Sequence, residues 1–182
     1  MCGNIIGIET DIVCIVVSLL ILFTLQMSYQ LKIQTRMFRS LLIWFSIFCF
    51  TGVLTHILPA GVVVFDRLTV CLKTITCSFI GYYWFTYTYY ATGRNSYKLK
   101  KWAPIAIAPA IIVVIYGLVD FFTHISDETL YLSPFLWIII TITGSIYFLL
   151  AFFIAFKRNS QTTNPFHKCE YRYLSIIALI PL

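Results

Sequence analysis

The chain has 182 residues, of which 60% are hydrophobic and only 11% are charged, and its mean hydropathy is +0.88. Soluble domains contain about half apolar and a quarter charged residues, so this composition excludes an ordinary soluble domain. The formal net charge is +6. We interpret this excess as basic residues that lie against the cytoplasmic membrane surface, not as a surface that binds nucleic acid. The sequence predicts an integral membrane protein whose first partner is the lipid bilayer.

Five segments are long and apolar enough to cross a bilayer, which requires about 20 residues. These segments cover residues 8–27, 38–58, 68–92, 102–123 and 134–156. A sixth apolar run begins at Tyr173 and stops after about half a span. We therefore predict an all-α polytopic membrane helix bundle with five complete spans and a truncated sixth. It forms one transmembrane domain over residues 1–182, incomplete at its C-terminus. A short helix in the membrane interface is the alternative for the sixth run.

Basic residues are concentrated in the links after the first, third and fifth spans. The opposite side carries most of the acidic residues, with Arg67 and Lys73 as its basic ones. Because basic loops stay in the cytoplasm, we predict a multi-pass protein of the inner (plasma) membrane with its N-terminus outside. A cytoplasmic output domain would then require a seventh span. The basic residues of the three links are Lys32, Arg36, Arg39, Arg94, Lys98, Lys100, Lys101, Lys157, Arg158, Lys168 and Arg172.

Four stretches resemble the multi-span sensory regions of Firmicutes-type diguanylate cyclases and seven-span histidine kinases. The first is LKIQTRMFRSLLIWFSIFCFTGVLTHIL, a polar link followed by a helix. The second, YYWFTYTYYATGRNSYKLKKWAPIAIAP, has an aromatic helix end, a basic loop containing Gly-Arg, and a helix opened by prolines. The third and fourth are LYLSPFLWIIITITGSIYFLLAFFIAFKRN and YRYLSIIALIPL.

The resemblance implies a bacterial signal-transduction module that lacks its catalytic output domain. The chain itself is then not an enzyme, because kinase or cyclase activity would lie in sequence missing from it. Two further partners are expected. One is a small ligand from outside or from the membrane, and the other is a second copy of the chain. The alternative is a small membrane transport component, such as a substrate-binding subunit, which requires a complete sixth crossing.

The third predicted span carries polar residues at steps of three, seven, four and three, which place them on one face of a helix. They are Lys73, Thr76, Tyr83, Tyr87 and Tyr90. Polar groups within lipid need partners, so this face is expected to point into the bundle.

We predict that Lys73 pairs with Asp120 or Asp11, or contacts an anionic ligand. His56 lies near the same level of the bundle. These residues, together with Tyr83 and Tyr87, form the predicted ligand-binding site. In the alternative interpretation Lys73 extends to the membrane surface, the tyrosines near helix ends anchor the interface, and His56 is merely solvated.

A second face of the same span carries small residues, including Ser78 and Gly81. The fifth span offers a comparable set, Thr141, Gly144 and Ser145. Because small side chains let two backbones approach closely, we predict that these two spans pack together at Gly81 and Gly144. In the fourth span Pro109 lacks an N–H group, and a kink between Ile105 and Pro109 is expected.

The six cysteines are scattered and no CxxC pair occurs, so neither a disulfide framework nor a metal site is predicted. They are interpreted as small core residues. His167 and Cys169 fall in a predicted cytoplasmic loop, where a catalytic pair would lack a third group and a shielded cleft. No cofactor is predicted.

Overall fold

The computed structural model describes residues 2–27, 33–57, 63–93, 96–123 and 134–179 of the chain. Within these residues the protein is all-helical, which confirms the predicted fold class, and each predicted span corresponds to one helix. The helices are α1 (Cys2–Met27), α2 (Ile33–Ile57), α3 (Val63–Ala91), α4 (Ser96–Thr123), α5 (Pro134–Gln161) and α6 (Pro165–Leu179).

Among the described residues, four helices contain segments long and apolar enough to cross a membrane. The prediction of five complete spans goes beyond this finding, because α3 does not reach the same hydropathy. Its sequence contains Asp66, Arg67 and Lys73 together with many threonines and tyrosines. The four apolar segments are Gly7–Leu25 in α1, Gln34–Ile57 in α2, Pro104–Thr123 in α4 and Ile138–Gln161 in α5.

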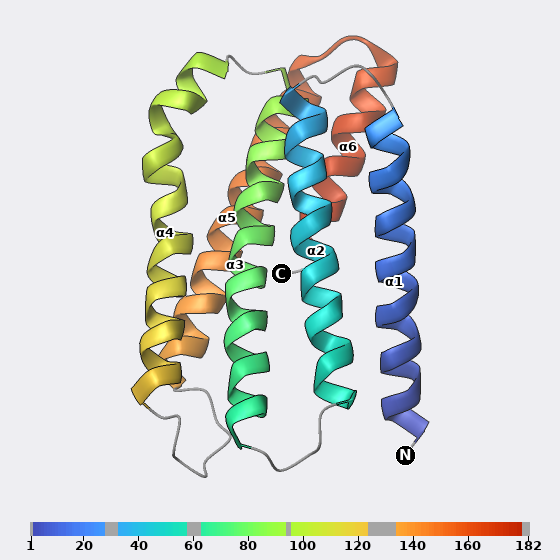
Figure 1. Ribbon diagram of the computed structural model, residues 1–182. Helices are drawn as coiled ribbons and strands as arrows, with labels where there is room; N and C mark the ends of the chain where they lie inside the picture. The colour runs from blue at the N-terminus through green and yellow to red at the C-terminus, as the bar shows by residue number, and fades with distance from the viewer. Residues whose placement is uncertain (1, 28–32, 58–62, 94–95, 124–133, 180–182) are drawn as a thin grey trace.

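The polar helix α3 occupies the middle of the bundle. It packs against α2 on one side and against α4 and α5 on the other (Figure 1). Large apolar side chains of α1, α4 and α5 are exposed on the outside, as expected for surfaces that face lipid. The helix with the most polar residues is therefore enclosed by helices with apolar outer surfaces.

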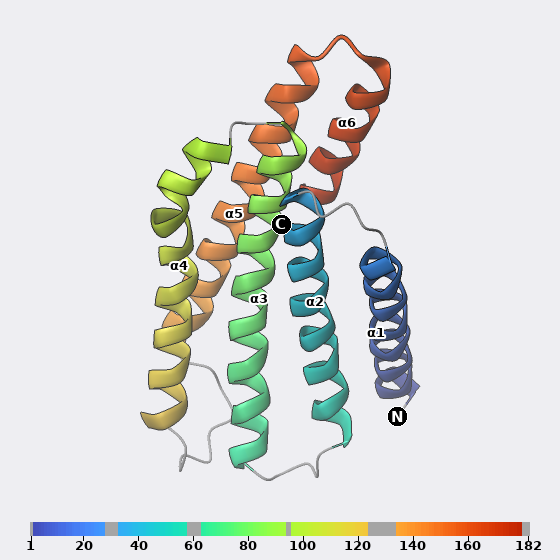
Figure 2. The ribbon, with the colours of Figure 1, turned by 45° about the horizontal axis from the view of Figure 1, so that its top comes forward.

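Helices α1 and α6 lie at the edges of this arrangement. Among the described helices, the extensive contacts of α1 are with α2 alone, and those of α6 are with α5. Figure 2 shows α1 standing beside α2 and separate from the other helices. Helix α6 runs back along one end of α5 and stops well before the other end of the bundle (Figure 1).

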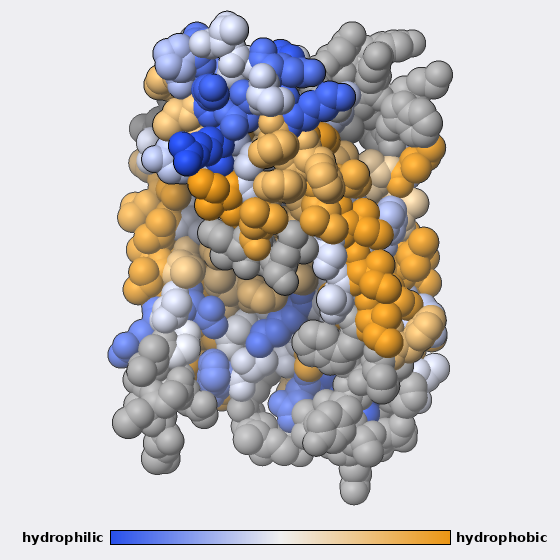
Figure 3. Space-filling model, turned by 180° about the vertical axis from the view of Figure 1, so that it is seen from behind, coloured by the Kyte–Doolittle hydropathy of each residue, from blue (hydrophilic) through white to orange (hydrophobic). Residues whose placement is uncertain are grey.

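The polar stretch before the sixth apolar run is helical, so the prediction of a loop around His167 and Cys169 is wrong. Helix α6 begins at Pro165, and the side chain of Asn164 accepts a hydrogen bond from the N–H group of Phe166 at 3.0 Å. Asparagine before the first turn and proline within it are a favourable helix start. The polar start of α6 lies at the end of the bundle where hydrophilic surface gathers (Figure 3).

Most buried hydroxyl groups of α3 bond to carbonyl groups of their own helix. Thr76 donates to the carbonyl of Leu72 at 2.8 Å, and Ser78 donates to that of Thr74 at 2.9 Å. Such bonds satisfy a hydroxyl without requiring a second helix. They allow α3 to place small polar residues at helix contacts in an apolar bundle.

The C-terminal end of α3 is closed by a glycine. Gly93 has a φ angle of 67°, a backbone conformation that glycine adopts without a steric penalty. Its N–H group donates to the carbonyl of Tyr90 at 3.0 Å, and the Gln34 side chain of α2 donates to the same carbonyl at 2.9 Å. The last turn of α3 is thereby tied to the start of α2.

Helices α3 and α5 pack together, but not through two small-residue stripes. A Cβ atom added at Gly81 would lie 3.2 Å from Cδ2 of Tyr147, whereas one added at Gly144 would have no atom within 4 Å. Ser78 is buried, Ser145 is half-buried and Thr141 is exposed. The close approach is therefore made at Gly81, not at Gly144, because the α5 face toward α3 carries Tyr147 instead.

We predict that Gly81→Ala is less stable than Gly144→Ala by about 1–3 kcal/mol, the usual cost of overpacking a fixed neighbour. Both substitutions gain the helix propensity of alanine, so their difference isolates the contact with Tyr147. Thermal unfolding of the two purified variants in the same detergent would measure it. Equal stability of the two variants would show that Tyr147 moves aside without cost.

Candidate functional site

The most specific polar contact between helices is made by Tyr147 of α5, a side chain that is only 2% exposed. Its hydroxyl donates a hydrogen bond to the carbonyl of Ala106 at 2.6 Å and accepts one from the N–H group of Ala110 at 3.3 Å. Both groups belong to the backbone of α4. One side chain of α5 is thus hydrogen-bonded to two backbone groups of the neighbouring helix.

The position of these bonds follows from Pro109, which lies inside α4. Ala106 and Ala110 are four residues apart, the spacing at which an uninterrupted helix bonds its own carbonyl and N–H groups. A proline in this turn lacks an N–H group and crowds the preceding turn, which weakens the local helix. The Tyr147 hydroxyl supplies a donor and an acceptor at this weakened turn, where a kink was expected from the sequence.

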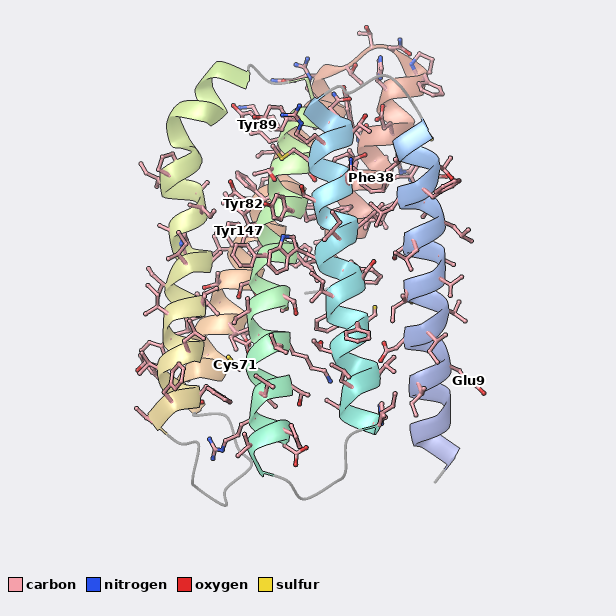
Figure 4. All side chains as sticks on the ribbon, in the orientation of Figure 1. Glu9, Phe38, Cys71, Tyr82, Tyr89 and Tyr147 are labelled. Atoms are coloured by element: carbon pink, nitrogen blue, oxygen red, sulfur yellow. The ribbon has the colours of Figure 1, made fainter. Side chains whose placement is uncertain are left out.

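The ring of Tyr147 joins a third helix to the same point. It lies against Gly81 of α3, and its ring centre is 6.1 Å from that of Tyr82 and 6.2 Å from that of Phe85. Figure 4 shows Tyr147 and Tyr82 close together between α3 and its neighbours. We call Tyr147, Gly81, Ala106 and Ala110 the three-helix junction.

Asp120, one of the predicted partners of Lys73, lies near Cys71 of α3. Asp120 of α4 interacts electrostatically with Cys71 of α3, whose thiol donates a hydrogen bond to the carbonyl of Gly117 at 3.6 Å. Lys73 leaves α3 about 200° around the helix from Cys71, because each residue turns the helix by about 100°. The lysine therefore leaves α3 on the side away from Cys71, and its pairing with Asp120 stays a prediction.

The remaining predicted ligand residues lie at other places. His56 is exposed at the end of α2, and its Nε2 atom lies 3.7 Å from the Cβ position of Gly7 in α1. Tyr83 is about 15 Å and Tyr87 about 21 Å along α3 from Lys73, at a rise of about 1.5 Å per residue. The Tyr87 ring packs on Phe38 of α2 at a centroid distance of 5.2 Å. Lys73, Tyr83 and Tyr87 share one face of α3 but are spread along about 21 Å of it.

A row of polar and small residues forms the contact between α1 and α2. The carboxylate of Asp11 lies on Gly52, where an added Cβ atom would overlap with it. One turn further along α1, the side chain of Cys14 lies near that of Cys49 in α2. By contrast, Figure 4 shows Glu9 pointing away from the bundle. We call Asp11, Cys14, Cys49 and Gly52 the α1–α2 seam.

An apolar cleft of about 290 Å³ opens between α2, α3, α5 and α6. Its volume is at the lower limit of those usual for small-molecule sites. All of its lining residues are apolar or aromatic, so it offers no charged group to a ligand. They are Phe38, Leu41, Leu42, Phe45, Ile80, Trp84, Phe148 and Ile177.

Comparisons with protein-family models, curated proteins and solved structures found no match. Among the residues that the structure describes, no group of three or more His, Cys, Asp or Glu side chains is placed to hold a metal ion. The resemblance to bacterial sensory regions therefore stays a prediction from the sequence.

Sequence reasoning did not identify Tyr147. Its position four residues before Ala151 and eight before Ala155 places it on the face of α5 that carries these buried alanines. That pattern could have indicated a helix contact, since alanines allow close packing and Tyr147 needs room there. The partner in α4 could not be identified, because the two segments are about 40 residues apart in the chain.

We predict that Tyr147→Phe lowers the free energy of unfolding by about 1–3 kcal/mol, because the backbone groups of Ala106 and Ala110 lose their hydrogen bonds to the hydroxyl while the ring is kept. Tyr116→Phe is the matched control, since Tyr116 belongs to α4 and is exposed. Thermal unfolding in detergent provides the measurement. If both variants unfold at the wild-type temperature, the hydroxyl of Tyr147 does not stabilise the bundle.

Proposed function

We propose that this chain is the membrane-embedded sensory part of a bacterial signalling protein of the histidine kinase or diguanylate cyclase class. The three-helix junction is the observation that carries the proposal. Tyr147 holds a proline-containing turn of α4 by two hydrogen bonds and stands against Gly81 of α3. A signalling bundle needs an element with two arrangements. A hydrogen bond that is either formed or broken is such an element.

The junction can pass a change in one helix to the others. If a ligand or a change in the membrane shifts α3, Gly81 moves relative to Tyr147, and the hydroxyl contact with α4 changes with it. The bias that a ligand exerts equals its difference in affinity for the two arrangements. Lys73, half-buried on the central helix, is the first outer residue to test for ligand contact.

In this proposal α3 is a fifth crossing and the bundle has its N-terminus outside. Two observations support a crossing by α3: it is surrounded by α2, α4 and α5, and several of its buried hydroxyls bond to its own carbonyls. The orientation is supported by basic residues at the end where α5 leads into α6, including Lys157, Arg158 and Lys168. Helix α6 would enter the same membrane from its cytoplasmic side.

The orientation predicts which side of the membrane exposes Cys169, an exposed free thiol near the start of α6. In a variant that keeps this cysteine alone, a membrane-impermeant maleimide should label inside-out vesicles and leave right-side-out vesicles unlabelled. A single cysteine at Ile57→Cys, a position 69% exposed at the opposite end of α2, should show the reverse. Labelling of Cys169 from the outside would contradict the proposed orientation.

The sensory proposal also predicts a change in output when the junction is weakened. In a fusion of the chain to a histidine kinase output domain with a transcriptional reporter, Tyr147→Phe should shift the basal signal by about 5-fold or more. This corresponds to about 1 kcal/mol or more between two arrangements. Tyr116→Phe should leave the signal unchanged. Equal signals from both variants, at equal amounts in the membrane, would contradict the role of the junction.

The apolar cleft favours the second candidate, a membrane transport component that binds a small substrate. A pocket lined only by apolar and aromatic residues suits an uncharged hydrophobic molecule. The measurement that separates the candidates is the composition of the purified protein. A small molecule recovered at one equivalent per chain would favour transport, and an output that responds to Tyr147→Phe would favour sensing.

A further inference from the structure

Two free cysteines on neighbouring helices face each other inside the bundle. Cys14 belongs to α1 and Cys49 to α2, and both are free cysteines whose side chains lie near each other. Cys49 is 3% exposed and Cys14 is half-buried. Contact between two thiols is the first geometric requirement for a disulfide bond.

The pairing of these cysteines follows from the register of two antiparallel helices. Gly7 contacts His56, and Asp11 contacts Gly52. Along α1 the contact residues are Gly7, Asp11 and Cys14, at steps of four and three. Along α2 their counterparts are His56, Gly52 and Cys49, at the same steps in the opposite direction. Because both helices rise equally per residue, the same row of contacts places Cys14 opposite Cys49.

Small residues lie at the contact between α1 and α2 near this pair. Gly52 lies about one turn from Cys49 and leaves no room for a Cβ atom, because the Asp11 carboxylate occupies that position. A disulfide requires Cα atoms within about 7 Å, a distance that helices reach where small residues form the contact. The α1–α2 seam has such residues at Gly52 and at both cysteines.

We propose that Cys14 and Cys49 form a reversible disulfide that fixes α1 to α2. In the oxidation the two S–H bonds break, one S–S bond forms, and two protons and two electrons leave the pair. A lipid-soluble quinone accepts them and becomes a quinol. An oxidant of this class fits because both cysteines lie within the apolar segments Gly7–Leu25 and Gln34–Ile57, where charged oxidants are excluded.

The disulfide would act at the only extensive attachment of α1 among the described helices, its contact with α2. With both thiols reduced, packing along the seam holds α1 in place. With the disulfide formed, Cys14 stays linked to Cys49 even where the packing along the seam is lost. The inference concerns the seam and does not depend on the proposed sensory function.

Thiol counting in membranes tests the proposal. Membranes containing the wild-type chain are treated with tetramethyl-1,4-benzoquinone, which has no free ring position for thiol addition, then denatured and labelled with a polyethylene-glycol maleimide. The chain has six cysteines, so oxidation should remove two of six mass tags. Reduction with dithiothreitol after the oxidation and before the labelling should restore both tags. Cys14→Ser and Cys49→Ser should lose no tag, whereas the matched control Cys77→Ser, at an exposed cysteine of α3, should still lose two.

Thermal unfolding of the same samples tests whether the bond fixes α1. Oxidation should raise the unfolding temperature of the wild type by about 5–10 °C, reversibly, as expected for a disulfide that closes a long loop. Cys14→Ser should show no such rise. The proposal is overturned if all six thiols stay reactive, if Cys14→Ser loses two tags, or if the disulfide forms without changing the unfolding temperature.

Discussion

The bundle depends on how polar groups are satisfied where the surrounding medium offers no hydrogen-bond partners. An unbonded polar group in hydrocarbon costs several kcal/mol, roughly the effect of a destabilising core mutation or more. Helix α3 meets this constraint in two ways. Hydroxyls such as that of Ser78 bond to the carbonyl groups of their own helix, and the helix is enclosed by α2, α4 and α5. A helix too polar to face lipid can therefore occupy the centre.

The same constraint explains the junction at Tyr147. A proline inside α4 weakens one turn, and a buried tyrosine hydroxyl has two hydrogen-bonding functions that need partners. The two needs are met together, because the tyrosine hydroxyl donates to the carbonyl of Ala106 and accepts from the N–H group of Ala110 in that turn. The bond is directional, so it fixes the rotation of α5 relative to α4 in a way that apolar packing does not. This is why a single side chain can couple three helices.

The attachment of α1 is of a different kind. Its contact with α2 consists of small and polar residues in one row. A carboxylate lying on a glycine allows the helices to approach, and two thiols come together one turn away. An edge helix held through one seam can change its position without disturbing the junction. The two features therefore divide the bundle into a coupled core and a separately attached edge.

The sequence by itself determined the all-helical fold, the approximate positions of the first five helices, and the close helix contact at Gly81. These follow from local quantities, since transfer free energy adds up along a segment and proline or glycine acts on its own turn. The sequence did not show that Asp120 of α4 lies near Cys71 of α3, that Tyr147 instead of Gly144 contacts Gly81, or that Cys14 lies near Cys49. Those outcomes depend on how each helix is rotated about its axis and which helix stands beside it. Only the tertiary structure decides them, because the residues that meet are far apart in the chain and their contact energies arise after the helices have packed.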